Sequence, residues 1–423
     1  MKKTKFAAVL SLCMVPAMFW SSESQAIPSW ARKYNVSCYM CHSGMPQRNA
    51  VGEAFKNNGY RFPGAQEAAY TKQKNIKIGN EEWDKAFPDA PLTGSFPQFD
   101  ALSVVLTGDI VSFTQPTHNA AGTIVTPRAL NINAANAGAL FYGVSIGDNL
   151  TVFGEMNGFG SNAAAGSVIR SSNRAVWQFS PGFNLAFGNF FSNAGFNGTE
   201  AGGVVNVSSL LPGPATYAEL NFTRGESAGY SIVAGTSMGA TSATPITAAN
   251  NIDDIIYVRG KVKLYGAGLL SGANGELGNS YNGLDNQVTV GAGFSSARNT
   301  VVGQGFSGNY LGETFVYGAD VQAAHNNSMV GLAVSRDKDL ALTNYQVDAG
   351  SFIYPWLFAK VAYKDITNRA NAGVRLPQVQ PSVSAWITPA VSLTGTYTYN
   401  TKTIVQAPLA AANTFIVAIR AGF

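Results

Sequence analysis

The sequence has few cysteines, three in 423 residues. Cys13 lies in an apolar run that follows three lysines, and the run is followed by Ser24-Gln25-Ala26, the small-x-small pattern of a cleavage site. We therefore expect residues 1–26 to be a cleaved signal peptide that directs export. Two cysteines then remain, Cys38 and Cys41, which are too few for a disulfide framework even in an oxidising compartment.

Charge is scarce as well, and it is unevenly distributed. Charged residues make up 12% of the chain, about half of what soluble domains contain. Residues 101–423 hold sixteen basic and sixteen acidic side chains. The formal net charge of +4 is too small to indicate a nucleic-acid partner. After the signal peptide, no apolar run is long enough for a transmembrane helix.

A membrane-crossing β-barrel is the fold class that these absences favour. Its strands alternate between lipid and lumen, so the average hydropathy stays near neutral; a large soluble β-sandwich or solenoid is the alternative. In residues 391–399 the odd positions are mainly Val, Leu and Tyr, and the even positions are Ser and Thr. Arg259, Lys261 and Lys263 share one parity, opposite Val262, so we expect these cations to line the lumen.

Short and long connections also alternate along the chain. Short turns are predicted at 147–149, 180–182, 224–229, 325–327, 354–356 and 388–389, and longer links at 114–127, 161–167, 195–203, 239–251 and 367–373. Short turns at one end and long loops at the other are typical of outer-membrane barrels. The pattern predicts a mainly β fold, a transmembrane antiparallel β-barrel of about sixteen strands, or eighteen if residues 252–312 add a hairpin.

A haem-attachment motif lies near the N-terminus. Residues 38–42 read Cys-Tyr-Met-Cys-His, the C-x-x-C-H site of a c-type haem. The two thiols add to the haem vinyl groups, and the adjacent imidazole binds the iron. A zinc site would need a second cysteine pair, which is missing, and a thioredoxin-like dithiol would lie near a βαβ pattern, which is not visible. We therefore predict one covalent haem c, attached at Cys38 and Cys41, with His42 as an axial ligand of the haem iron.

Residues 27–97 are predicted to form a small α-helical c-type cytochrome domain around this motif. A helix is expected to open at Pro46, to bury an apolar face over residues 50–55 and to stop at Gly59. A second short helix is expected over residues 80–87. The aromatic residues that could pack on the porphyrin are Tyr34, Phe55, Tyr60, Phe62 and Trp83.

The distal haem ligand is not evident within this domain. Met329 opposes Val330 in the alternation and therefore points into the lumen near a predicted turn, and His325 lies in that turn. If the haem domain sits at the periplasmic mouth of the barrel, Met329 or His325 could be the distal ligand. A lumen methionine and a turn histidine need no iron, which is the simpler interpretation of each.

The residues around the motif resemble those of a known family. Residues 31–38 lead into the motif, which is followed by Pro46, Gly52, Phe55-Lys56 and Gly59-Tyr60. This pattern resembles the fused monohaem cytochrome–porins of the outer membrane, best known from iron-oxidising bacteria. The resemblance implies a c-type cytochrome before a porin-like barrel, proximal ligation by the motif histidine, and electron uptake from extracellular Fe(II).

An electron conduit across the bacterial outer membrane is the leading functional hypothesis. The corresponding regions are the signal peptide (1–26), the monohaem cytochrome domain (27–97) and the barrel (98–423). A barrel of this size has room for a small haem domain, which would connect extracellular Fe(II), or another metal or redox partner, with periplasmic cytochromes. The alternatives are a transport porin gated or regulated by a haem domain, and a periplasmic cytochrome with a soluble β partner domain. No catalytic residues are predicted, so any Fe(II)-oxidising activity would be electron transfer by the haem.

Overall fold

The structure is a computed structural model of the chain. It describes residues 28–34, 36, 40–44, 47–62, 75–77, 95–97, 102–118, 123–132, 137–159, 170–189, 216–238, 255–271, 285–297, 314–338, 342–367, 375–388, 391–401 and 412–422. Among these residues, no helix is long and apolar enough to cross a membrane.

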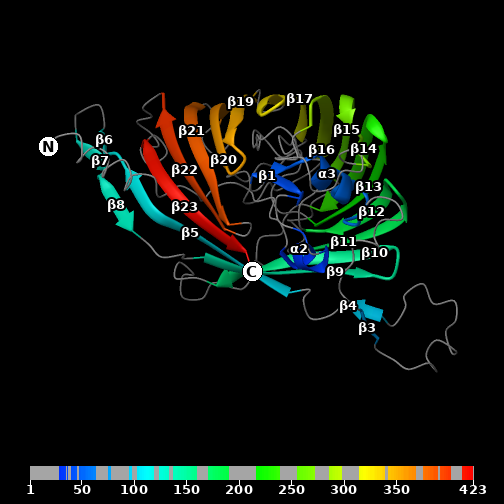
Figure 1. The fold of residues 1–423 in the computed structure, drawn as a ribbon. Coiled ribbons are helices and arrows are strands. Elements are labelled where there is room, and N and C mark those ends of the chain that lie inside the picture. The colour runs from blue at the N-terminus through cyan, green and yellow to red at the C-terminus, as the bar shows by residue number, and fades with distance from the viewer. Residues whose placement is uncertain are drawn as a thin grey trace, which may run out of the picture.

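Antiparallel strands close into a barrel that accounts for most of the described chain (Figure 1). Its strands are β5 (Leu102–Thr114), β8 (Ala129–Ile132), β9 (Ala137–Ile146), β10 (Leu150–Phe159), β11 (Arg170–Ser180), β12 (Phe183–Gly188), β13 (Thr216–Arg224), β14 (Ser227–Met238), β15 (Ile255–Ala267), β16 (Gln287–Ala297), β17 (Thr314–His325), β18 (Ser328–Asp337), β19 (Leu342–Tyr354), β20 (Leu357–Thr367), β21 (Arg375–Thr388), β22 (Val391–Asn400) and β23 (Thr414–Gly422).

The described barrel has sixteen strands, because β8 and β9 pair with opposite ends of β5 and act as one interrupted strand. Neighbouring strands in the ring are neighbours in sequence, and β23 pairs with β5 to close it. The predicted mainly β fold, an antiparallel barrel, and the count of sixteen strands are confirmed. The eighteen-strand alternative is wrong, since β15 pairs directly with β16, and β16 with β17.

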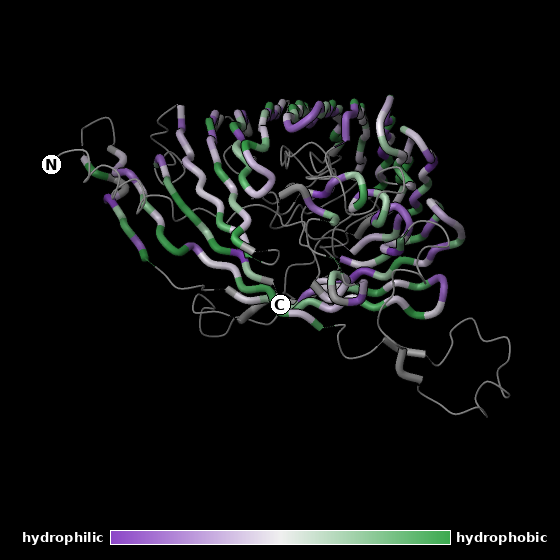
Figure 2. Tube along the Cα trace, in the orientation of Figure 1, coloured by the Kyte–Doolittle hydropathy of each residue, from purple (hydrophilic) through white to green (hydrophobic). Residues whose placement is uncertain are grey.

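The predicted alternation of polar and apolar residues is present in the barrel wall (Figure 2). On β15, Arg259 and Lys263 are each 3% exposed and face inward, whereas Val262 and Leu264 are 47% and 60% exposed on the outer face. On β18, burial alternates at every position. The outer wall is therefore mainly apolar, and the lumen side of these strands carries the polar residues, as the sequence pattern predicts.

Short turns join β9 to β10, β11 to β12, β13 to β14, β17 to β18, β19 to β20 and β21 to β22, at the positions predicted. Because consecutive strands are antiparallel, these turns all lie at one end of the barrel. The predicted long links fall largely outside the described residues. Within the first of them, β6 (Thr117–His118) pairs with β7 (Ile124–Thr126).

The N-terminal segment lies inside the barrel. It contains α2 (Pro28–Tyr34), β1 (His42–Gly44), β2 (Gln47–Arg48) and α3 (Ala50–Asn57). Figure 1 shows β1 and α3 enclosed by the curved sheet, with α2 beside β9 and β10. Every residue of α3 is buried, which is unusual for a short helix that carries charged side chains and indicates that the surrounding wall covers it.

The rest of the predicted cytochrome domain is described only in part. β3 (Asn75–Lys77) pairs with β4 (Ser95–Pro97), and the helix predicted over 80–87 lies outside the described residues. A compact helical domain over residues 27–97 therefore stays a prediction.

The start of α3 differs from the prediction. The helix begins at Ala50 and not at Pro46, so the predicted start is wrong. Asn49 caps the helix, because its side-chain oxygen accepts a hydrogen bond from the Gly52 amide at 2.9 Å. This bond satisfies one of the amide donors that the first turn of a helix leaves without a partner.

The end of α3 is where the sequence predicts it. Gly59 has a φ of +68°, a left-handed conformation that glycine adopts without the steric cost of a Cβ atom. The Asn58 amide donates to the carbonyl of Ala54 at 2.9 Å, and the Gly59 amide donates to that of Lys56 at 3.1 Å. These bonds use the carbonyls that the last turn leaves exposed.

Gly59→Ala should destabilise the last turn of α3 by about 1 kcal/mol, because alanine is disfavoured at positive φ. The added Cβ would lie 3.5 Å from Gln178, an ordinary contact, so the cost comes from the backbone. Faster hydrogen exchange of the α3 amides should report the change. Gly260→Ala on β15, where an added Cβ meets nothing within 4 Å, is the matched control, and equal protection of α3 in both variants would contradict this expectation.

Candidate haem site

The second half of the predicted haem-attachment motif is held on a short hairpin inside the barrel. Cys38 lies outside the described residues. Cys41 is partly exposed, and the His42 side chain is buried. His42 begins β1 and is paired with Arg48 of β2. A thiol and an imidazole are thus fixed next to each other on one tight turn of chain.

The first turn of α3 packs directly against this hairpin. The Asn49 amide donates to the carbonyl of Cys41 at 3.0 Å, and the Asn49 side-chain amide donates to that of Met40 at 3.2 Å. A Cβ atom on Gly52 would lie 2.2 Å from the Cys41 carbonyl oxygen, so only glycine permits this approach. This role of Gly52 was not predicted; the sequence feature that indicates it is a glycine inside a predicted helix, which usually has a packing reason.

Apolar side chains gather beside the motif. The buried members of this aromatic cluster are Tyr34, Met40, Val51, Phe55 and Phe62, and Trp30, Val36, Cys41 and Tyr60 pack against them. The Tyr34 and Phe62 ring centroids lie 4.6 Å apart, and those of Trp30 and Phe55 lie 5.2 Å apart. Four of the five aromatic residues proposed from the sequence therefore meet here, and Trp83 lies outside the described residues.

The aromatic cluster continues into the barrel wall. Phe153 on β10 points into the lumen, with its ring centroid 4.4 Å from that of Tyr60 and 5.2 Å from that of Trp30. Gly143 on β9 leaves space for the Trp30 indole, since an added Cβ would lie 2.9 Å from its Nε1. This contact was not predicted. The sequence feature that indicates it is Phe153, an aromatic residue at a lumen-facing position of an alternating strand.

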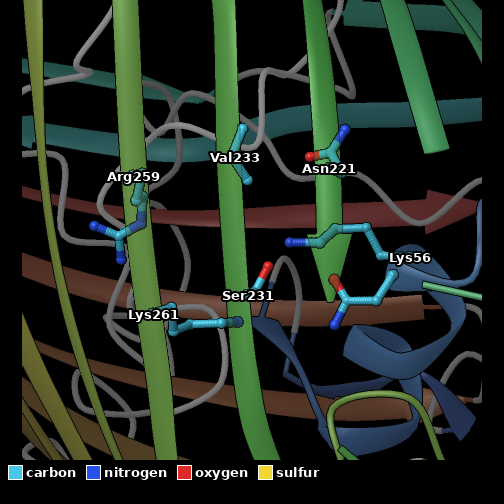
Figure 3. A pocket seen from close by; sticks show the side chains of 7 residues that line it. Lys56, Asn221, Ser231, Val233, Arg259 and Lys261 are labelled. Carbon is cyan, nitrogen blue, oxygen red and sulfur yellow. The ribbon is translucent and has the colours of Figure 1, made fainter. Parts of the chain in front are cut away.

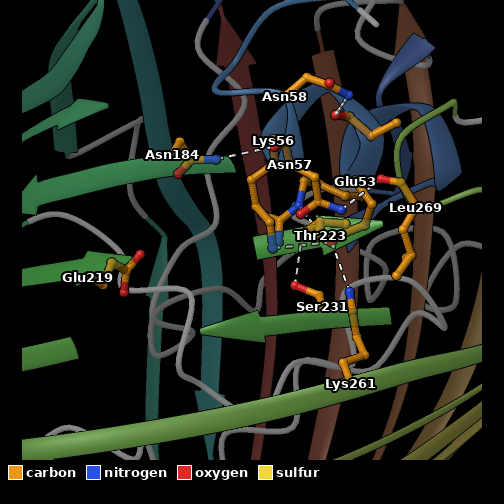
Figure 4. A network of polar contacts seen from close by, with 12 residues as sticks. Glu53, Lys56, Asn57, Asn58, Asn184, Glu219, Thr223, Ser231, Lys261 and Leu269 are labelled. Atoms are coloured by element: carbon orange, nitrogen blue, oxygen red, sulfur yellow. Dashed lines mark hydrogen bonds and ion pairs between the residues drawn. The ribbon is translucent and has the colours of Figure 1, made fainter. Parts of the chain in front are cut away.

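A buried carboxylate joins α3 to the barrel (Figure 4). Glu53 lies 2.7 Å from Arg48 Nε, 3.1 Å from Lys56 Nζ and 3.3 Å from Lys261 Nζ on β15. Burial by itself would raise the pKa of Glu53, but the three cations hold this pKa well below its usual range. Burial lowers the pKa of Lys56 to about 7, against the opposing effect of Glu53. Lys261, which was predicted to line the lumen, therefore binds the N-terminal segment through Glu53.

Hydrogen bonds to backbone carbonyls fix the C-terminal end of α3. The side chains of Asn57 and Asn58 donate to the carbonyls of residues 269–270, each at 2.9 Å. The Arg61 guanidinium donates to two carbonyls at the β9–β10 turn, at 2.8 Å and 3.0 Å. The segment is thus seated at the short-turn end of the lumen.

A second buried ion pair lies beside Tyr60. Arg174 on β11 is 2.7 Å from Glu219 on β13, and the hydroxyl of Tyr257 on β15 donates to the other oxygen of Glu219 at 3.1 Å. The Arg174 guanidinium also lies over the Tyr60 ring, 5.8 Å from its centroid, within the range of a cation–π contact. The wall therefore contacts the aromatic cluster with both an apolar and a charged group.

The two candidate distal ligands lie away from the aromatic cluster. Met329 faces inward as predicted, and it packs with Ala324, Phe352 and Phe358 in a separate buried cluster. His325 is exposed at the end of β17. Among the described residues, the cluster around Cys41 includes neither side chain. Distal ligation by Met329 or His325 stays a prediction.

The described residues around Cys41 and His42 fit the requirements of a haem. No group of three or more His, Cys, Asp or Glu side chains that could hold a metal ion occurs in the described part of the chain. Haem iron needs only axial ligands from the protein, because the porphyrin supplies the others. His42, the neighbouring Cys41 thiol and an adjoining set of aromatic rings match this smaller requirement.

Comparison with known proteins shows only a weak likeness in fold. No protein-family model matches the chain, and no curated protein matches it. Solved structures with a similar fold include two mutants of the porin of Rhodopseudomonas blastica, with 8% and 9% sequence identity and TM-scores of 0.45. Each alignment covers 76% of this chain and 100% of the porin. This likeness is too weak to add to what the strand pairing shows.

Gly52→Ala should lower the amount of covalently bound haem. The added methyl group would meet the Cys41 carbonyl, so α3 must move away from the hairpin, at a cost of about 1–3 kcal/mol. Haem content per polypeptide, measured on the denatured protein, should fall relative to Gly395→Ala, where the nearest atom to the added Cβ is 3.6 Å away. Equal haem content in the two variants would show that this contact does not serve attachment.

Proposed function

We propose that the chain is an outer-membrane electron-transfer protein, in which a barrel crosses the membrane and holds a c-type haem segment in its lumen. Its partners are extracellular Fe(II), or another metal or redox compound, and periplasmic cytochromes. The observation that carries the proposal is the seating of the segment with Cys41 and His42 inside a closed barrel, through the Glu53–Lys261 ion pair and the Phe153 contact.

The distribution of side chains on the barrel supports a membrane location. Closure of the ring leaves no edge strand, which is a requirement for backbone in hydrocarbon. Large apolar side chains are exposed on the outer face of many strands, among them Leu220, Ile232, Val262, Val290, Leu332 and Val347. A soluble barrel would present polar residues there. Together with the predicted signal peptide, this wall supports the outer membrane over a soluble β partner domain.

The motif residues would hold the haem through Cys38, Cys41 and His42. When bound, haem supplies reversible one-electron chemistry. The chain contributes position and insulation, because Asn49 and Gly52 fix the hairpin that presents the thiol and the imidazole. The aromatic cluster and the barrel wall bury the His42 side chain. A redox centre fixed in this way is a stationary relay rather than a diffusing carrier.

A haem-regulated transport porin is the second candidate. The same polar contacts that seat the N-terminal segment in the lumen would also obstruct a pore, and their release would open it. Conductance in planar bilayers separates the two candidates. A conduit whose segment stays seated conducts ions poorly at all redox states, whereas a regulated porin changes its conductance when the haem is reduced.

Adding Fe(II) to outer membranes that contain the chain should produce a reduced-minus-oxidised haem spectrum. Cys38→Ala and Cys41→Ala should each diminish the covalently bound haem, since each removes one thioether. Haem that is reduced by dithionite but not by Fe(II) would exclude Fe(II) as the donor. A chain without covalent haem would exclude electron transfer altogether.

Val262→Arg on β15 should destabilise the barrel in lipid by about 2–4 kcal/mol, because it places a charge on the hydrocarbon-facing wall. Val262→Met is the matched control, with a side chain of similar length and no charge. Urea unfolding in lipid vesicles measures the difference. Equal unfolding midpoints for the two variants would indicate that water covers this wall.

A further inference from the structure

A small polar pocket lies where α3 meets the barrel wall (Figure 3). It is lined by Lys56 and Asn57 from α3, Asn221 from β13, Ser231 and Val233 from β14, and Arg259 and Lys261 from β15. The interior has room for about one water-sized particle. The pocket therefore lies between the two parts of the chain that the Glu53 ion pairs hold together.

The lining of this pocket is basic. Lys56, Arg259 and Lys261 are cationic, and no lining residue is acidic. The carboxylates that pair with these cations are not part of the lining: Glu53 pairs with Lys56 and Lys261, and Asp320 lies 2.7 Å from Arg259. A space lined by ammonium, guanidinium, amide and hydroxyl groups suits an anion better than a cation or an apolar group.

The two lysines reach the pocket from different elements. In Figure 3, Lys56 and Lys261 extend toward the space beside Ser231 from opposite sides. Their side chains are only 7% and 11% exposed. An ion between them would be shielded from bulk water, and its attraction to both ammonium groups would be stronger than at an exposed surface.

We propose that this pocket binds one small inorganic anion of about the size of chloride, held between Lys56 of the N-terminal segment and Lys261 of the barrel. Asn221 and Ser231 complete the polar lining, and Val233 limits its size. The anion bridges the two parts of the chain and offsets the repulsion between their buried cations. It is a binding site for a free ion that contributes to seating the segment.

The charge state of Lys56 makes this binding depend on pH. Burial lowers the pKa of Lys56 to about 7, with Glu53 on α3 opposing this effect and Arg48 on β2 and Lys261 on β15 adding to it. Arg259 on β15 also lines the pocket. The ammonium form of Lys56 binds the anion, so the affinity is highest below this pKa and falls as pH rises through it.

Equilibrium dialysis of the full-length holoprotein with radiolabelled chloride tests the proposal, with gluconate keeping the ionic strength constant. We expect one saturable site per chain at pH 6, and weaker binding at pH 8. Lys56→Met should weaken binding by at least about tenfold, the loss expected for one charge-assisted contact. Lys360→Met on β20, which removes a lumen lysine outside the pocket, should leave the affinity unchanged.

A second variant separates the pocket from the ion pairs. Val233→Met adds bulk to the pocket and keeps every charge, so it should also weaken chloride binding. In gluconate buffer without chloride, hydrogen exchange of α3 should be the same in this variant as in the wild type. The proposal is overturned if no saturable binding occurs up to about 0.15 M chloride. It is overturned as well if Lys56→Met and Lys360→Met bind equally. It is also overturned if only a Cys38→Ala/Cys41→Ala double variant, which lacks both thioether bonds, binds chloride, because a carboxylate of the cofactor would then occupy the pocket.

Discussion

The closed ring of strand pairing is the constraint on which the rest of the structure depends. Because β23 pairs with β5, the sheet has no open edge. Alternate side chains of each strand then face either the outside of the barrel or its lumen. The outer set can be apolar without aggregation through an edge. The inner set is enclosed, so its charged members need partners within the lumen.

The N-terminal segment supplies part of those partners. Glu53 forms an ion pair with Lys261 of the barrel wall. The side chains of Asn57 and Asn58 donate hydrogen bonds to the carbonyls of residues 269–270, which follow β15. Buried ion pairs add little net stability, but removing one member leaves an uncompensated charge. These contacts therefore define one seated position, while the packing of Trp30 and Tyr60 on Phe153 supplies the apolar burial that stabilises it.

Much of the barrel is predictable from the sequence, because a period of two is a local signal. The inward position of Arg259 and Lys263, the short turns and the count of sixteen strands all follow from it. The C-x-x-C-H spacing likewise identifies the candidate site without any structure. The predicted start of α3 at Pro46 was wrong because Asn49 caps the helix. A side-chain cap stabilises a helix start more than a proline at the first helical position does.

The contacts that hold the N-terminal segment in the lumen could not be predicted from local sequence patterns. Glu53 and Lys261 are 208 positions apart in sequence, and no periodicity connects them. No sequence pattern distinguishes Gly52 from other glycines in helices. Its role is evident only in the structure, where the Cys41 carbonyl lies beside it. Such long-range contacts depend on the fold that they join.

The location of these contacts has a consequence for assembly. The wall groups described above as holding the segment, from Gly143 on β9 to the carbonyls of residues 269–270, belong to the part of the sheet that ends shortly after β15. These contacts can therefore form before β16 to β23 are added. An N-terminal segment can dock on an open half-sheet, and the ring can close around it in the last pairing step, without threading a folded unit through a finished pore.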